Sequence, residues 1–149
     1  MTFGSPPSER PGDRGFRRTS GAVDCVIEAW GPDRVACLAE AVGGLVGLFT
    51  EVPDAAATTT LPVVLESAPA PDLLVTLLEE VIATVDVFGK VPAHVHLAEA
   101  EDGGVAGDLE VVDADTLHLT GPVPKSVSWH GLEFGETGGA WRCRVVVSR

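Results

Sequence analysis

Two apolar segments that lie far apart in the sequence, residues 24–31 and 125–133, each begin with a charged residue. Asp24 opens the first segment and Lys125 opens the second, with His130 a few positions further on. A carboxylate at a strand start can act as a general base or bind a cation, and lysine or histidine can assist it. The residues alone favour a structural ion pair or two exposed strand ends over a catalytic site.

A second candidate is the pair of histidines His94 and His96, which alternate with apolar residues. This spacing can place two imidazoles on one metal ion, but a zinc site needs a third protein ligand nearby. We therefore favour a solvated strand face. Sequence signatures of common hydrolases, metalloproteases and nucleotide-binding loops are absent.

The chain contains three cysteines, Cys25, Cys37 and Cys143. An odd number without a Cys-x-x-Cys spacing argues against a disulfide framework or a zinc cluster. The local apolar pattern places all three on inward-facing positions. This predicts small buried hydrophobic residues in a reducing, cytoplasmic environment.

Length and composition predict one soluble domain, because 149 residues with 45% hydrophobic content contain no apolar run long enough to cross a membrane. Residues 1–14 lack the apolar core of a secretory signal, and we expect a disordered basic tail before a domain at 15–149. Residues 21–149 contain six Lys and Arg against twenty Asp and Glu. Such a field repels a phosphate backbone and attracts a basic protein, so we expect no direct nucleic-acid binding.

The first half of the chain predicts two strands followed by a helix. Phe16–Ser20 and Cys25–Trp30 are the strands, and Gly31-Pro32 opens the helix because proline suits a first helical position. The apolar residues at helical spacing are Val35, Leu38, Val42, Leu45, Val46 and Phe49. Three glycines in this helix, Gly43, Gly44 and Gly47, are costly there and indicate close approach to a sheet.

A third strand and a second helix follow. Thr58–Ser67 is a strand that Pro62 restricts to a sheet edge. Asp72 is expected to cap an amphipathic helix. The apolar face of that helix consists of Leu73, Leu74, Leu77, Leu78, Val81, Ile82 and Val85.

The chain beyond Gly89 reads as β-structure. Val91–Leu97 alternates, Asp102-Gly103-Gly104 forms a hairpin turn into Val105–Val112, and Trp141–Ser148 is a final alternating strand. Two helices followed by a β-rich half predict an α+β fold, with the helices packed on a mostly antiparallel sheet.

Several of these segments together resemble the archease family, over residues 15–149. The matching segments are Gly15-Phe16, Asp24–Gly31, Gly44–Thr50, Asp72–Val75, Lys125–Glu133 and Trp141–Val147. The resemblance implies a strand-helix-strand-strand fold. It also implies a non-enzymatic accessory protein for the tRNA-splicing RNA ligase, which seals RNA ends with GTP and manganese. In that role the protein promotes guanylylation and repeated turnover of the ligase, and Asp24, Lys125 and His130 would form the partner surface.

The same resemblance implies a divalent-cation site, for calcium, at Asp24, Ser148 and Arg149. This chain departs from the family pattern at two positions: Gly21 stands where the family has histidine, and Ser148 where it has aspartate. A hard cation prefers six or more oxygen ligands, including charged carboxylates. Asp24 and the terminal carboxylate of Arg149 could contribute two, Ser148 offers only a neutral hydroxyl, and the positive charge of the Arg149 side chain opposes a cation. We therefore expect weak cation binding.

Two other functional readings stay open. The first is a diverged archease-fold module that binds another protein and has lost both metal binding and ligase activation. The second is a small hydrolase in which Asp24 is the general base and His130 or Lys125 assists.

Overall fold

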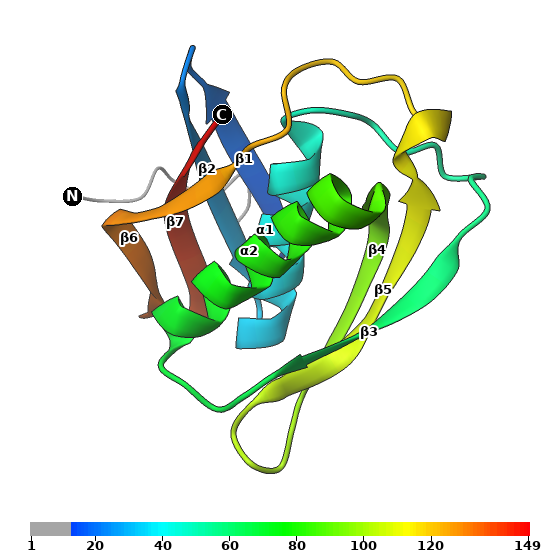
Figure 1. Cartoon of the computed structure of the whole chain (residues 1–149). Coiled ribbons are helices and arrows are strands. Elements are labelled where there is room, and N and C mark those ends of the chain that lie inside the picture. The colour runs from blue at the N-terminus through cyan, green and yellow to red at the C-terminus, as the bar shows by residue number, and fades with distance from the viewer. Residues whose placement is uncertain (1–12) are drawn as a thin grey trace.

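The structure, a computed structural model, describes residues 13–149, and within them seven strands form two antiparallel sheets (Figure 1). The four-stranded sheet has the order β1 (Gly15–Ser20), β2 (Asp24–Gly31), β7 (Ala140–Ser148) and β6 (Ser126–Thr137). The three-stranded sheet has the order β3 (Thr59–Leu65), β5 (Val105–Asp113) and β4 (Lys90–Glu99). The helices are α1 (Arg34–Gly47) and α2 (Ala70–Phe88), with a short 3-10 helix at Ala114–Thr116. The α+β class is confirmed, and the strands divide between two sheets rather than one.

The four-stranded sheet joins segments from opposite ends of the chain. In its register Asp24 pairs with Ser148, and Ser148 pairs in turn with Ser126. Alternation along β2 and β7 sends one set of side chains into the core, as predicted. The buried set on these two strands is Cys25, Ile27, Ala29, Cys143, Val145 and Val147.

Helix α1 begins at Arg34 because Asp33 caps it: the Asp33 Oδ1 accepts a hydrogen bond of 2.8 Å from the Ala36 N–H. Pro32 therefore precedes the cap and does not occupy the first helical position, which corrects the expectation from the sequence. The prediction of close glycine packing is confirmed. A Cβ at Gly44 would lie 2.7 Å from the Ile27 Cγ2.

Helix α2 begins at Ala70, two residues before the cap that the sequence predicted. The cap residue is Pro69, no side chain makes a capping hydrogen bond, and Pro71 lies in the first turn, where it needs no N–H partner. The prediction that Asp72 caps this helix is therefore wrong. Its carboxylate lies in the first turn, where the helix dipole still favours negative charge. The helix ends at Gly89 in the left-handed conformation, with φ of 63°.

The three-stranded sheet matches its sequence pattern closely. Strand β3, which contains Pro62, lies at one edge, as predicted. The turn between β4 and β5 is the predicted hairpin, in which the Gly104 N–H donates to the Asp102 Oδ1 over 2.8 Å. An irregularity in the pairing between Pro92 and His94 is the one departure from regular alternation that β4 shows against β5.

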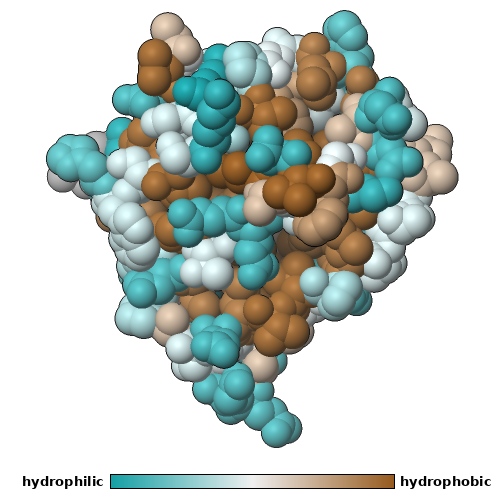
Figure 2. Space-filling model, viewed as in Figure 1, coloured by the Kyte–Doolittle hydropathy of each residue, from teal (hydrophilic) through white to brown (hydrophobic). Residues whose placement is uncertain are grey.

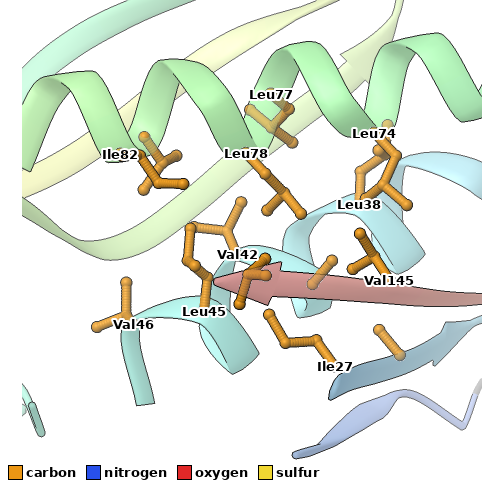
Figure 3. Close-up of a cluster of buried hydrophobic side chains, with 14 of the residues drawn as sticks. Ile27, Leu38, Val42, Leu45, Val46, Leu74, Leu77, Leu78, Ile82 and Val145 are labelled. Carbon is orange, nitrogen blue, oxygen red and sulfur yellow. The ribbon is translucent and has the colours of Figure 1, made fainter. Parts of the chain in front are cut away.

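One hydrophobic core lies around the two helices, which Figure 1 shows between the four-stranded and the three-stranded sheets. Figure 3 shows side chains of α2 above those of α1, with Val145 of β7 beside the α1 side chains and Ile27 of β2 below them. The three cysteines are buried and unbonded, as predicted. Hydrogen bonding with Cys143 and burial both raise the pKa of the Cys37 thiol, so it stays protonated and unreactive. Within residues 13–149 neither helix combines the length and apolar character needed to cross a bilayer.

Charge is distributed very unevenly between the two sheets. Residues 51–120, which contain α2 and the three-stranded sheet, carry fourteen Asp and Glu against a single lysine, Lys90. We call this region the acidic half. The rest of the chain, including the four-stranded sheet, carries eight Asp and Glu against nine Lys and Arg. Apolar surface also reaches the outside, and Figure 2 shows it through the middle of one face among hydrophilic patches.

Candidate partner-binding site

The side chains of Asp24 and Ser148 meet at one end of the four-stranded sheet. Asp24 opens β2 and Ser148 closes β7, and the Ser148 hydroxyl donates to the Asp24 Oδ1 over 2.8 Å. Their neighbours Cys25 and Val147 point into the core, so alternation sends Asp24 and Ser148 to the outer face. Asp24 is exposed, and its carboxylate therefore carries little cost of burial.

Lys125 lies at the same end of the sheet, just before β6. Its backbone N–H donates to the Ser148 carbonyl over 2.7 Å, and its side chain is exposed. No ion pair in residues 13–149 joins Lys125 to Asp24. The structure thus brings these two residues to one end of the sheet through Ser148 and leaves both charged groups accessible.

His130 lies elsewhere, in a bulge of β6. Residues 129–132 have no partners in the register, which resumes at Glu133 opposite Arg144. Gly131 has a φ of 72°, which lets the chain turn back toward the strand, and the neighbouring Trp129 is 57% exposed. Asp24, Ser148 and Ser126 lie opposite one another in the register, and His130 lies further along β6, beyond Ser128. Within residues 13–149 no hydrogen bond or ion pair joins His130 to Asp24 or Lys125, and its backbone N–H donates to the Ser128 hydroxyl over 3.1 Å.

Arg149 follows β7 and extends its side chain toward the end of α1. The guanidinium donates to the Leu48 carbonyl over 3.2 Å and to the Gly21 carbonyl over 3.4 Å. Its backbone N–H donates to the Val23 carbonyl over 2.8 Å. The residue is a hydrogen-bond donor at this site, and its side chain offers no ligand to a cation.

Apolar side chains surround this polar end. Val23, in the turn between β1 and β2, is 61% exposed, and Leu119 is 48% exposed. Leu119 bridges to Thr50 at the end of α1, next to the Leu48 carbonyl that Arg149 contacts. Exposed aliphatic groups beside accessible charges are typical of protein contact surfaces. We call Val23, Asp24, Leu119, Lys125 and Ser148 the strand-end surface.

The donors at this end do not fit a hard divalent cation. Such an ion takes six or more oxygen ligands and favours several carboxylates, whereas Asp24 supplies one carboxylate that already accepts a hydrogen bond from Ser148. Across the described residues 13–149, no three His, Cys, Asp or Glu side chains gather closely enough to hold a metal. Asp24, Ser148 and Arg149 are neighbours, but Arg149 contributes a positive charge.

The other candidate from the sequence, His94 and His96, lies on the exposed face of β4, as expected for a solvated strand. The His96 Nε2 contacts the Glu110 carboxylate of β5, and this contact lowers the pKa of Glu110. The two imidazole rings are 6.5 Å apart between centroids. His96 therefore makes a surface contact with Glu110, and His94 lies beside it.

Comparison with known proteins identifies the family. The model of the Archease protein family matches residues 16–148. Two curated relatives from strains of Mycobacterium tuberculosis, each described as a probable protein archease, are 39% identical over 139 residues, which is 93% of this chain and 77% of each relative. The chain belongs to the archease family.

Solved structures show that the archease fold is preserved in this chain. The solution structure of protein 1598 from Methanobacterium thermoautotrophicum has a TM-score of 0.66 at 19% identity and covers 91% of this chain and 99% of its own. The crystal structure of an archease from Thermotoga maritima, described as a possible chaperone, has a TM-score of 0.62 at 17% identity over the full length of both chains. At these identities the likeness supports the fold alone.

Sequence reasoning missed the apolar part of the strand-end surface in this archease. Val23 lies in the bend between β1 and β2, and Leu119 in an isolated β-bridge with Thr50, so both lie outside the regular elements in which periodicity indicates exposure. Reasoning from the sequence also treated Arg149 only as a hindrance to a cation. The signal that could have revealed the contact of Arg149 with Leu48 is its basic side chain, because a helix C-terminus attracts positive charge.

Proposed function

We propose that this protein is a non-enzymatic accessory factor of a tRNA-splicing RNA ligase, and that it promotes guanylylation and repeated turnover of that enzyme. Asp24 and Lys125 contact the ligase, and Val23 and Leu119 provide apolar contacts around them. Family membership supports the class of function. The single observation that carries the assignment to this surface is that Asp24 and Lys125 both hydrogen-bond Ser148, while their exposed charged groups form no ion pair with any residue of 13–149.

The geometry at Asp24 agrees better with binding than with catalysis. A hydrolase that used Asp24 as general base with His130 would need the two side chains within hydrogen-bond reach of one substrate. His130 instead lies in the bulge of β6, beyond Ser128. The hydroxyl of Ser148 donates to Asp24, an arrangement in which the serine is held as a donor and no histidine activates it.

The acidic half supports a basic protein partner. Fourteen carboxylates against one lysine produce a field that steers a positively charged surface toward the molecule and repels free RNA. Apart from Leu119, the strand-end surface lies on the half whose charges nearly balance. Long-range attraction and close contact are therefore assigned to different parts of the molecule.

The test is a multiple-turnover ligation assay with the RNA ligase of the same organism, GTP and manganese. We expect the full chain to accelerate turnover, and Lys125→Ala to reduce that acceleration roughly tenfold, the effect of losing one good interface contact. Asp24→Asn should act in the same direction. Neither change should move the melting temperature much, because exposed charges contribute little to folding.

The chain offers matched controls in the acidic half. Lys90→Ala removes the other lysine, and Asp86→Asn removes an exposed aspartate of α2; both should preserve the stimulation. Equal losses with Lys90→Ala and Lys125→Ala would assign the effect to net charge and contradict the strand-end surface. A folded wild-type chain that fails to stimulate the ligase would overturn the proposed function itself.

A second candidate function is an archease-fold binding module that contacts a different protein and activates no ligase. The observation that favours it is the donor set at Asp24, which pairs one carboxylate with a serine and a neighbouring arginine. In the ligation assay this candidate predicts no stimulation by a protein with an intact thermal transition. Stimulation that depends on Lys125 would exclude it.

A further inference from the structure

Arg149 connects three separate parts of the structure. Its guanidinium reaches the Leu48 carbonyl at the end of α1 and the Gly21 carbonyl in the turn between β1 and β2. Gly121, in the loop before β6, lies close to both Leu48 and Arg149. A Cβ at Gly121 would lie 3.1 Å from the Leu48 oxygen and 3.4 Å from the Arg149 Nη2. One side chain thus touches the helix, the hairpin turn and the loop that leads to Lys125.

The end of α1 requires a positive charge that the helix does not supply. The last carbonyls of a helix lack intrahelical partners and carry partial negative charge, and basic groups near them are stabilising. α1 has no basic residue in its last turn, and Leu48 is its C-cap residue. Arg149 therefore supplies from β7 the charge that is usually found on the helix itself.

The turn between β1 and β2 presents its carbonyl to the same guanidinium. The Gly21 N–H donates to the Asp24 carbonyl over 3.0 Å, which closes the turn. A Cβ at Gly21 would lie 2.5 Å from that oxygen, so a larger residue requires the backbone to move. The turn in this chain therefore depends on Gly21. A histidine at this position would require the backbone of the turn to move.

We propose that Arg149 is a built-in cation that holds the Asp24 end of the four-stranded sheet together without a bound metal ion. The guanidinium neutralises the end of α1 and binds two backbone carbonyls, while the one carboxylate nearby is engaged by Ser148. Among side chains, a divalent ion in this region would meet one carboxylate, that of Asp24, and the positive charge of the Arg149 guanidinium. The folded state of this chain is accordingly independent of calcium and manganese.

The test is the melting temperature of the full chain in EDTA, in 1 mM calcium and in 1 mM manganese, where both concentrations are of the order used for weak sites. We expect the same melting temperature in all three conditions for the wild type. Arg149→Gln should lower it by about 4 °C or more, because a partly buried charge at a helix C-terminus is lost. Arg149→Lys should fall between the two, since an ammonium keeps the charge but lacks the planar fork that reaches two carbonyls.

Arg144→Gln is the matched control, because Arg144 lies on the same strand and forms no hydrogen bond or ion pair with α1 within residues 13–149. A larger loss with Arg144→Gln than with Arg149→Gln would overturn the proposal, as would a wild-type melting temperature that rises saturably with calcium and loses that rise in Asp24→Asn. If Arg149→Gln does not fold, the Arg149→Lys variant decides. A melting temperature equal to that of the wild type in Arg149→Lys would show that two-carbonyl binding plays no part.

Discussion

The two sheets differ in how the chain builds them and in what they carry. The three-stranded sheet and α2 come from one continuous stretch, residues 59–113, which carries eleven Asp and Glu against one lysine and so most of the net negative charge. The four-stranded sheet joins β1 and β2 to β6 and β7, and its charges nearly balance. The proposed contact site lies on the sheet built from distant segments, because the pairing of β2 with β7 brings Asp24 to Ser148.

This contrast shows how one small domain can separate attraction from recognition. The acidic half acts over distances comparable to the Debye length and needs no defined geometry. The strand-end surface needs fixed positions, which a sheet locked by register and by Arg149 provides. Substitutions in each half can show whether the two halves differ in their contributions to the free energy of unfolding as they differ in charge.

The largest effect on stability is expected from truncation of side chains in the shared hydrophobic core. Ile27→Ala in β2 and Leu78→Ala in α2 each remove a fully buried side chain, and each should lower the free energy of unfolding by about 2–5 kcal/mol. All three tryptophans, Trp30, Trp129 and Trp141, belong to the four-stranded sheet. Tryptophan fluorescence therefore reports on that sheet, while far-UV circular dichroism reports on both helices.

Because one core serves both halves, we expect fluorescence and circular dichroism to give coincident denaturation curves in both variants. The exposed Val64→Ala on β3 is the control and should change little. Separate transitions for the two probes would show that the halves are independent folding units.

The next effect concerns the glycines that let α1 approach the four-stranded sheet. Gly44→Ala should lower the free energy of unfolding by about 1–2 kcal/mol, because its Cβ would lie 2.7 Å from a buried Ile27 methyl group. Gly47→Ala meets only the flexible Arg18 guanidinium, at 3.3 Å, so the gain of about 1 kcal/mol in helix propensity should dominate. Urea denaturation measures both. Equal effects of the two variants would contradict this account of helix packing.

A smaller effect separates the starts of the two helices. Asp33→Ala removes the N-cap hydrogen bond of α1 and should cost about 1 kcal/mol. Asp72→Ala removes only a favourable charge in the first turn of α2, worth about 0.3–1 kcal/mol at low salt. Thermal unfolding at low and high salt distinguishes them, since salt should weaken only the second contribution. A larger loss for Asp72→Ala would restore the cap that the sequence suggested.

The smallest effect is the pH dependence of stability that arises from the contact between His96 and Glu110 on the three-stranded sheet. The contact with His96 lowers the pKa of Glu110 below its ordinary value of 4.5. A carboxyl group whose pKa is lowered by folding stabilises the protein above its unfolded pKa, and this contribution is lost as the pH falls through the folded pKa. The melting temperature of the wild type should thus exceed that of Glu110→Gln at about pH 6, with the difference vanishing toward about pH 3. Glu101→Gln, an exposed turn carboxyl, is the control and should show no such convergence.

Most of the helices and strands could be predicted from the pattern of apolar residues along the sequence. Alternation in β7 and the apolar face of α2 were predicted residue by residue because both elements bury one face against one core. The start of α2 was misplaced because Pro71 is compatible with the first turn, so the helix extends beyond Asp72 to Ala70. The division into two sheets and the contact of Arg149 with Leu48 are tertiary properties, and no local pattern records them.

The strand order also determines when each part can form during synthesis. β7 is the last strand of its sheet to be made, yet it lies between β2 and β6, so the four-stranded sheet cannot close before it appears. Closing a loop from Asp24 to Ser148 is entropically costly, and pairings of such long range are slow. Until β7 emerges, a nascent chain that has passed β5 therefore exposes the open edge of β2 and the parts of α2 and α1 that later pack on β6 and β7. We expect this interval to be the period in which the protein is most prone to aggregate and most dependent on chaperones.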